Sequence, residues 1–233
     1  MSHEPRAQTQ PLTRATDDDA SFNLVHADDA LLVLDKPAGL LAVPGRGEDK
    51  QDCLSARVQA RYPDALVVHR LDMATSGLIV MARGIDSQRA LNRDFEKRQV
   101  HKRYLAVVYG RLDPPAGDDG WGLIDLPLTP DWLNRPRSVV DNAGGRASRT
   151  RWRVLSHDTA ANATRLVLEP VTGRSHQLRV HLQALGHPIL GDPLYAHPEA
   201  FNAAPRLLLH AERLTLFHPL SGVPMEFNSA VPF

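Results

Sequence analysis

The segment His69-Arg70-Leu71-Asp72-Met73-Ala74-Thr75-Ser76-Gly77 lies between two apolar runs, residues 65–68 and 78–82. Short apolar runs on both sides of a polar segment that ends in glycine are typical of two buried strands joined by a tight, exposed connection. An arginine and an aspartate beside a hydrophobic sheet are costly to bury unless they pair or perform chemistry. Two interpretations therefore stay open: a structural ion pair that fastens a loop, or a functional site built around Asp72.

The composition places the chain among globular proteins. Its 233 residues are 42% hydrophobic, and no apolar run approaches the roughly 18 residues that a membrane span needs. No cationic segment followed by an apolar one opens the chain, so no signal peptide is apparent. Cys53 is the single cysteine, which excludes an internal disulfide framework and fits a reducing compartment. We expect a monomeric cytoplasmic protein without membrane contact, in which Cys53 is a small core residue.

The charges are balanced overall but unevenly distributed. The 27 acidic and 27 basic residues give a formal net charge of zero, which argues against a purely electrostatic binder of polyanions. Residues 83–103 hold seven bases against three acids, and residues 134–153 hold six against one. Two basic segments in a neutral protein are consistent with a local phosphate-binding surface, although solvated charged faces are the ordinary alternative.

The order of the segments predicts an α+β domain. Residues 1–20 are polar and end in three aspartates, so we expect a disordered tail before one domain over residues 21–233. Further strands are predicted over residues 22–25, 31–34, 104–109, 165–169, 207–210 and 214–216. Helices are predicted over residues 54–62, over 86–98 with a cap from Asp86, and after a cap from Thr172 or Ser175. Leu178, Leu182 and Leu185 form the apolar stripe of that last helix, and Gly186 ends it.

Two sets of basic residues share a face of their element. Arg89, Arg93 and Lys97 are spaced by four, so they line one side of the second predicted helix. Arg149, Arg151 and Arg153 alternate with apolar or hydroxyl residues, so they share one face of a strand. Three like charges side by side repel unless something neutralises them, which favours phosphate contact at this strand.

Several common kinds of site are absent from the sequence. His176 and His181 are five residues apart and do not share a helix face, and no His-Glu-x-x-His or Cys-x-x-Cys pattern occurs. We therefore expect no metal site. A Gly-rich phosphate loop and a Gly-x-Ser-x-Gly elbow are also missing, which argues against a kinase and a serine hydrolase.

Three chemically capable groups remain, each beside an apolar strand: Asp72, Tyr104 and Arg174. An aspartate held by an arginine stays ionised at neutral pH and acts as a nucleophile or base. A nearby tyrosine stacks on a planar ring or exchanges a proton. Together with basic surfaces, these groups make a planar base in RNA or DNA a plausible substrate.

Five segments, in order over about residues 22–230, resemble the motifs of the RluA family of pseudouridine synthases. They are Lys36-Pro37-Ala38-Gly39-Leu40, the Asp72 segment, Lys102-Arg103-Tyr104-Leu105-Ala106, Gly173-Arg174-Ser175-His176-Gln177-Leu178-Arg179 and Leu207-Leu208-Leu209-His210-Ala211. The compact length without an N-terminal S4 domain, together with residues 131–136, is similar to one subgroup. That subgroup modifies both a tRNA anticodon stem-loop and a large-subunit rRNA hairpin.

The resemblance implies a mixed, mostly antiparallel sheet with flanking helices around a central cleft. It implies that Asp72 is the catalytic nucleophile or base, that Tyr104 stacks on the uracil and assists proton removal, and that Arg174 pairs with Asp72. It implies structured RNA as the partner and no cofactor, because the reaction is an isomerisation. We expect Arg70 to fill the gap left by the displaced nucleotide. The expected RNA contacts are His69, Arg70, Arg89, Arg93, Lys97, Lys102, Arg149, Arg151, Arg153, Gln177 and Arg179.

Three other functions stay open at this point. The chain could modify a different rRNA or tRNA uridine within the same family. It could be a non-catalytic RNA-binding or ribosome-assembly protein, although intact Asp72, Tyr104 and Arg174 argue against that. A glycosidase or nucleosidase with a carboxylate nucleophile is the third alternative, and release of free uracil would identify it.

Overall fold

The computed structural model describes residues 22–116 and 119–233, so the predicted tail over residues 1–20 lies outside the described residues. The strands are β1 Asn23–Ala27, β2 Leu31–Lys36, β3 Ala65–Val67, β4 Ser76–Arg83, β5 His101–Tyr109, β6 Gly122–Asp125, β7 Leu128–Pro130, β8 Ser138–Val140, β9 Arg149–Asp158, β10 Ala163–Pro170, β11 Leu209–Phe217 and β12 Pro224–Asn228. The helices are α1 Leu54–Arg61, α2 Gly84–Glu96, α3 Gln177–Ala184, α4 Pro198–Asn202 and the short 3-10 turn Glu48–Lys50.

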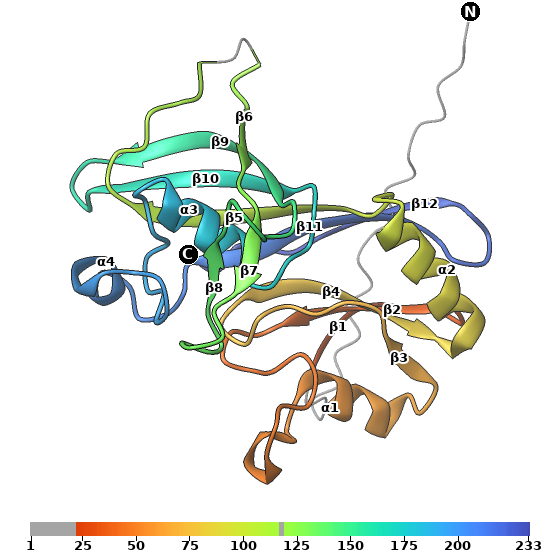
Figure 1. The fold of residues 1–233 in the computed structure, drawn as a ribbon. Helices are drawn as coiled ribbons and strands as arrows, with labels where there is room; N and C mark the ends of the chain where they lie inside the picture. The colour runs from red at the N-terminus through yellow and green to blue at the C-terminus, as the bar shows by residue number, and fades with distance from the viewer. Residues whose placement is uncertain (1–21, 117–118) are drawn as a thin grey trace, which may run out of the picture.

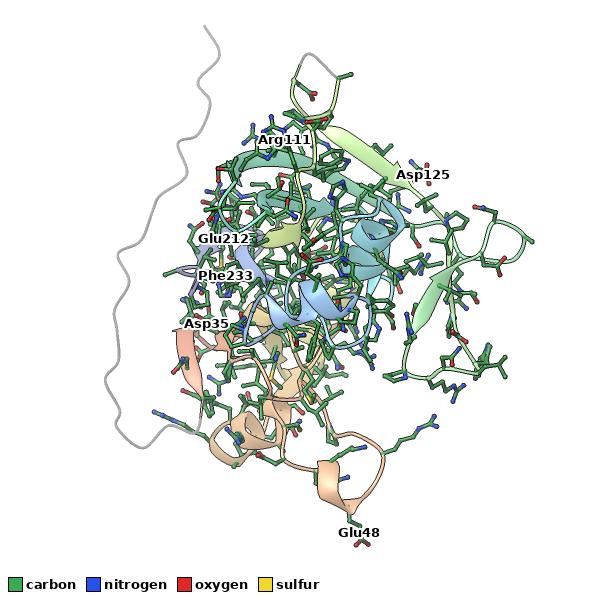
Figure 2. The ribbon with its side chains drawn as sticks, turned by 90° about the vertical axis from the view of Figure 1, so that its left-hand side faces the viewer. Asp35, Glu48, Arg111, Asp125, Glu212 and Phe233 are labelled. Atoms are coloured by element: carbon green, nitrogen blue, oxygen red, sulfur yellow. The ribbon has the colours of Figure 1, made fainter. Side chains whose placement is uncertain are left out.

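One long sheet organises the described part of the chain. Its order is β1-β2-β4-β11-β5-β10-β9-β6, with β3 paired to β4 and β12 paired to β11. Figure 1 shows α1 and α2 beside the β1–β4 half and α3 beside the half that holds β9 and β10. The hairpin β7–β8 forms a separate two-stranded sheet, and it stands off the body of the molecule in Figure 2, after the labelled Asp125. The prediction of an α+β fold with a mixed, mostly antiparallel sheet is confirmed.

Two hydrophobic cores cover opposite faces of the sheet. Alternate residues of β2 and β4 point to opposite faces because the side-chain period of a strand is two. The first core contains Leu32, Leu34, Ile79 and Met81 together with side chains of α1 and α3. The second contains Leu31, Val33, Leu78 and Val80 and is covered by α2 through Leu91. Strands β2 and β4 are therefore buried on both sides, as their continuous apolar sequences indicate.

The two halves of the sheet meet where β4 runs parallel to β11. This contact pairs Ser76 with His210 and Gly77 with Ala211. Gly77 has φ +109°, and a Cβ atom there would lie 2.3 Å from the carbonyl oxygen of Ala211. Only glycine permits this backbone conformation and this close approach. The glycine at the end of the segment His69–Gly77 is therefore what allows the strand after Asp72 to join the second half.

Four local predictions were wrong in detail. The predicted strands at 207–210 and 214–216 are parts of one strand, β11, which bends at a register shift between Ala211 and Arg213. Helix α2 begins at Gly84, so Asp86 lies in its first turn instead of capping it. Helix α3 has His176 as its N-cap residue and receives no side-chain cap from Thr172 or Ser175. Leu185 is 38% exposed and lies outside the apolar stripe.

The composition led us to expect a buried Cys53 and no membrane-spanning segment. Cys53 is fully buried, which confirms that it is a core residue. Among the helices in the described ranges, none has the length and apolar character needed to cross a membrane.

The close approach at Gly77 can be tested by adding one methyl group. We expect Gly77→Ala to lower the free energy of unfolding by more than about 3 kcal/mol, because both backbone strain and a clash with Ala211 oppose it. The matched control is Gly222→Ala, where φ is +70° but no atom lies within 4 Å of the added Cβ. That control should cost only about 1–2 kcal/mol. Urea unfolding of both variants measures the difference, and equal losses would show that the clash is unimportant.

Candidate active site

Asp72 lies in the loop between β3 and β4, at the wall of a large cleft. The loop is tightened by a hydrogen bond from the Thr75 amide to the Asp72 carbonyl oxygen, at 3.1 Å. The Asp72 side chain is 20% exposed, so its carboxylate is reachable but mostly enclosed. The cleft has a volume of about 1020 Å³, and its walls come from the β3–β4 loop, β5, the end of α2, the β10–α3 connection and β11. A cleft of this size can admit a nucleotide that has left its base stack.

Arg179 is the arginine that pairs with Asp72. Its Nη1 donates to the Asp72 Oδ2 atom at 3.3 Å. Its Nε and Nη2 donate to the two carboxylate oxygens of Asp192, at 2.8 and 2.6 Å. The Arg179 side chain is 3% exposed and that of Asp192 is fully buried. The buried carboxylate of Asp192 therefore holds the Arg179 guanidinium in place. The remaining guanidinium nitrogen, Nη1, faces the carboxylate of Asp72.

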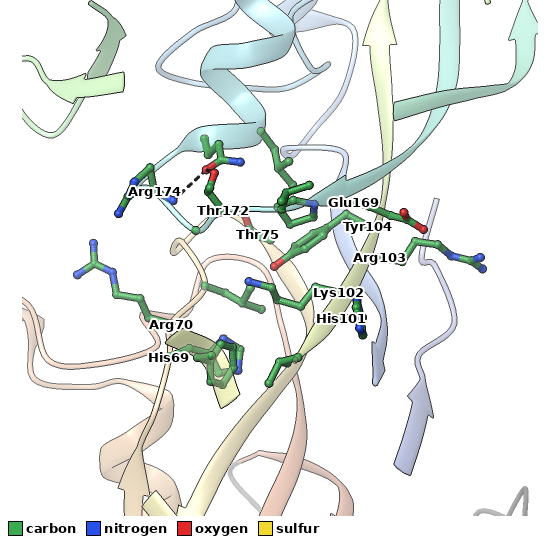
Figure 3. Close-up of a pocket in the computed structure, with 18 of the residues that line it drawn as sticks. His69, Arg70, Thr75, His101, Lys102, Arg103, Tyr104, Glu169, Thr172 and Arg174 are labelled. Carbon is green, nitrogen blue, oxygen red and sulfur yellow. Dashed lines mark hydrogen bonds between the residues drawn. The ribbon is translucent and has the colours of Figure 1, made fainter. Parts of the chain in front are cut away.

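The expectation that Arg174 forms an ion pair with Asp72 was wrong. Arg174 is exposed in the connection before α3, where its backbone amide donates to the Gln177 Oε1 atom at 3.1 Å. Helix α3 begins only at Gln177, so its first turn carries Arg179 toward Asp72 and leaves Arg174 on the rim of the cleft. Figure 3 shows Arg174 and Arg70 on the same side of the cleft, facing the open space between them. Arg179 bonds Asp72 in this structure, and its expected contact with RNA stays a prediction.

His176 lies beside Asp72 and was not predicted as part of the site. The His176 Nε2 atom lies 3.8 Å from Asp72 Oδ2, and its Nδ1 atom is hydrogen-bonded to the Tyr195 hydroxyl at 2.7 Å. Burial lowers the pKa of His176, although the Asp72 carboxylate opposes this effect. His176 has φ +56°, an unusual backbone conformation for a residue with a side chain. His176 therefore turns the chain into α3 and places a mostly neutral imidazole against the carboxylate.

Tyr104 faces Asp72 from strand β5. It is 8% exposed, and Figure 3 shows its hydroxyl directed into the cleft toward the side where Arg70 and Arg174 lie. Burial, and then the nearby Asp72 carboxylate, raise the pKa of Tyr104 well above its usual range. The phenol therefore stays protonated at neutral pH, a form that can stack on a ring and donate a hydrogen bond.

The residues expected to contact RNA divide into two groups by position. One group lines the cleft: His69, Arg70, Lys102, Arg151, Gln177 and Arg179. The other lies outside it on exposed or half-exposed surface: Arg89, Arg93, Lys97, Arg149 and Arg153. Arg89 forms an ion pair with Asp86 at 3.6 Å. The cleft thus collects expected contacts from three of the resembling motifs, while most residues of the basic stripes flank it.

Two of the lining residues have their polar groups committed to the protein. The His69 Nε2 atom accepts a hydrogen bond from the Val80 amide at 3.0 Å, and its ring stacks on Phe95. The Gln177 side chain is 4% exposed and bonds Thr172, Thr150 and the backbone of Arg149. Both side chains hold segments of the cleft wall together, and their expected contact with RNA stays a prediction.

The three arginines of β9 share a face, as predicted, but they are already partly neutralised. Arg149 lies 3.3 Å from Asp125, and Arg151 lies 3.1 Å from Glu169. Arg151 and Arg153 also lie over the ring of Trp121, at 4.6 and 5.1 Å from its centroid. Strands β6 and β10 therefore supply carboxylates beside two of these arginines, so part of the repulsion that favoured phosphate contact is relieved within the protein, and phosphate contact stays a prediction.

Lys36 holds the Asp72 loop through hydrogen bonds to backbone carbonyl oxygens. It is fully buried, and its Nζ atom donates to the carbonyl oxygens of Pro37, Leu40 and Met73 at 2.8, 2.7 and 3.1 Å. Burial lowers the pKa of Lys36 to about 8, although the charge of Asp72 acts in the opposite direction. The ammonium group therefore ties the loop of the first resembling motif to the residue that follows Asp72.

The low pKa of Lys36 predicts a dependence of stability on pH. Its usual value is 10.5, so between pH 8 and 10.5 the unfolded chain binds a proton that the folded chain does not. Stability then rises with pH across this window, because the cost of burying the charge is relieved. We expect the wild type to gain roughly 2–3 kcal/mol between pH 7.5 and pH 10 relative to Lys36→Met. Urea unfolding at both pH values checks this, and parallel changes in the two proteins would contradict it.

Within the described ranges, no three or more His, Cys, Asp or Glu side chains are grouped so that they could hold a metal ion.

The sequence and the fold both match known proteins. Residues 30–184 match the family model described as RNA pseudouridylate synthase. The dual-specificity RNA pseudouridine synthase RluA of Escherichia coli (strain K12) is 50% identical over 210 residues, which are 90% of this chain and 93% of that protein. The protein of the same name from Haemophilus ducreyi is 47% identical over 209 residues, with 90% and 93% coverage.

Solved structures agree with this assignment. Human RNA Pseudouridylate Synthase Domain Containing 1 is 27% identical and superimposes with a TM-score of 0.75, covering 92% of this chain and 85% of that one. Human RNA Pseudouridylate Synthase Domain Containing 4, at 24% identity and a TM-score of 0.70, shares the fold over 90% of this chain and 88% of that one. The chain therefore belongs to the RNA pseudouridine synthase family.

Proposed function

We propose that this enzyme isomerises uridine to pseudouridine in two kinds of RNA, a tRNA anticodon stem-loop and a large-subunit rRNA hairpin. The proposal for two targets rests on its identity of about half with relatives named as dual-specificity enzymes, across nearly the full length of both chains. The observation that carries the chemistry is the position of Asp72, held by Arg179 at the wall of a cleft that also contains Tyr104.

Asp72 is the group that starts the reaction, as nucleophile or base. The bond between uracil N1 and ribose C1′ breaks, the uracil turns, and its C5 atom forms the new bond to the same C1′ atom. The proton leaves C5, and N1 is protonated, so the atoms balance without a cofactor. The ionised carboxylate is the form that can attack or accept a proton, and the Arg179 guanidinium holds it in place.

Tyr104 holds the uracil while it turns. Its ring lies in the wall of the cleft, and its hydroxyl is aimed into the open space. Because burial favours the neutral phenol, stacking and hydrogen-bond donation are the roles that its environment supports before the C5 proton is lost. It assists removal of that proton once the new carbon–carbon bond has made it acidic.

The target nucleotide has to leave its stack to reach Asp72. Extruding a base costs a few kcal/mol, and a side chain that fills the vacated space offsets part of this cost. Arg70 is exposed at the cleft, two residues before Asp72, and has the length for this task. Lys102, Arg174 and the flanking stripes of α2 and β9 then contact phosphates, which position the RNA without reading its sequence. We propose that the enzyme acts as a monomer in the cytoplasm.

The first test replaces the carboxylate. Asp72→Asn keeps the shape of the side chain but removes its charge, so tritium release from RNA labelled at uracil C5 should become undetectable while RNA binding persists. The matched control is Asp113→Asn, at an exposed carboxylate outside the cleft, which should keep wild-type turnover. Turnover by Asp72→Asn above the uncatalysed rate would refute the catalytic assignment.

The second test removes the buried partner of Arg179. Asp192→Asn leaves the guanidinium without its bidentate carboxylate, so we expect a loss of roughly 3–5 kcal/mol in stability. Because Asp72 then loses its fixed orientation, kcat should fall at least about 10-fold while KM changes much less. Asp64→Asn, which breaks the exposed pair with Arg83, is the control and should cost no more than about 1 kcal/mol. An unchanged kcat in Asp192→Asn would show that the clamp does not orient Asp72.

A further inference from the structure

The hairpin between β7 and β8 presents two large apolar side chains to solvent. We name residues 131–137, the turn of this hairpin, the tip. Trp132 is 69% exposed and Leu133 is 95% exposed. Single exposed apolar residues are common, but two neighbours on a projecting turn form a contact surface rather than an incidental patch. Neither residue touches the cleft, so the proposed chemistry leaves them unexplained.

Hydrogen bonds within the turn hold the tip in one conformation. The Asp131 Oδ1 atom accepts hydrogen bonds from the amides of Leu133 and Asn134, at 3.2 and 3.1 Å. Its Oδ2 atom accepts one from the Asn134 side chain at 2.8 Å. The Asp131 amide donates to the Arg137 carbonyl oxygen, and the Arg137 amide donates to that of Asn134, at 2.9 and 3.0 Å. The two apolar side chains are therefore presented on a fixed support, which lowers the entropy lost when they bind.

The tip also carries positive charge arranged on an aromatic ring. The Arg135 guanidinium lies 3.8 Å from the centroid of the Trp132 ring. Arg137 lies over the ring of Tyr195 at 5.3 Å. The Asp131 carboxylate offsets one of the two arginine charges of the tip, and the exposed cation is that of Arg135. An aromatic ring beside arginine is the combination that stacks on bases and neutralises phosphates.

The tip lies within reach of an RNA bound in the cleft. At the base of the hairpin, the Ser138 amide donates to the Tyr195 hydroxyl at 2.8 Å. That hydroxyl bonds His176 at 2.7 Å, and His176 lies 3.8 Å from Asp72. Leu133 is five residues from Ser138, so it projects at most about 18 Å beyond it. A short RNA stem that continues from the uridine in the cleft covers this span.

We propose that Trp132 and Leu133 are an RNA-contacting wedge that packs against bases of the substrate beyond the modified uridine, while Arg135 contacts the adjacent backbone. This inference rests on the proposed function, because it takes RNA as the molecule in the cleft. The RNA would then contact the enzyme at a second place, separate from Asp72. This contact gives residues 131–136 a role in substrate binding that the reaction at Asp72 does not explain.

The test compares exposed apolar residues at two places. The probe is an anticodon stem-loop transcript. Its dissociation constant is measured with variants that also carry Asp72→Asn, and turnover is measured with variants that keep Asp72. Trp132→Ser with Leu133→Ser should raise the dissociation constant about 10–100-fold, as expected for the loss of one stacked base. The kcat at saturating RNA should stay within about twofold. Trp132→Phe, which keeps an aromatic face, should bind within about threefold of wild type.

The control variant carries Leu220→Ser and Val223→Ser in the turn between β11 and β12. These side chains are 64% and 57% exposed, so this variant also replaces two neighbouring exposed apolar side chains by serine, and binding should be unchanged. An unaltered dissociation constant in the tip variant, with normal turnover, would overturn the wedge and leave the tip for another macromolecule such as a protein. Wild-type protein that does not convert uridine in any RNA would instead reject the proposed function itself.

Discussion

The buried guanidinium of Arg179 is the interaction on which the site depends. A charge removed from water is tolerated only when it is paired and its hydrogen bonds are satisfied. Asp192 supplies two of those bonds from inside the protein, and Asp72 supplies a third from the cleft. The amides of Leu194 and Tyr195 donate to Asp192 in turn, at 2.8 and 3.2 Å. Helix α3, the chain around Asp192 and the β3–β4 loop are thereby joined through one side chain.

A second constraint places the Asp72 loop against the other half of the sheet. The parallel contact between β4 and β11 is short, and it depends on the absence of a side chain at Gly77. Lys36 holds the same loop from the opposite side through the carbonyl oxygen of Met73. The Asp72 segment is therefore fixed at Met73, at Gly77 and through the Asp72 carboxylate, and such preorganisation would serve the proposed chemistry.

Most of the fold follows from local patterns. Continuous apolar runs predicted β2 and β4, and four-residue spacing predicted α1 and α2, because periodicity reports which side of an element is buried. Asp72 was also accessible to sequence reasoning, since its polar segment interrupts two buried strands. The resembling motifs then identified the cleft residues Tyr104 and Arg174, whose separation along the chain hides their proximity. Expectations for the RNA contacts themselves remain predictions.

The pairing of charges could not be read from the sequence. Arg174 and Arg179 are five residues apart, and which of them faces Asp72 depends on where α3 begins, a boundary that capping patterns placed too early. Asp192 belongs to a segment that reads as an ordinary turn, so nothing local marks it as buried. The register of β9 against its neighbours decides that Asp125 and Glu169 lie beside arginines. Such contacts between distant segments exist only after the chain has folded.

The carboxylates beside the β9 arginines change how this surface should interact with a polyanion. RNA binding gains much of its strength from the release of condensed counterions, one set for each phosphate that a free cation neutralises. Where Asp125 and Glu169 already occupy Arg149 and Arg151, an arriving phosphate exchanges one ion pair for another. The net gain at each position is then small. A neutral protein built in this way holds RNA mainly where shape and stacking also fit, and it releases an RNA that offers charge alone.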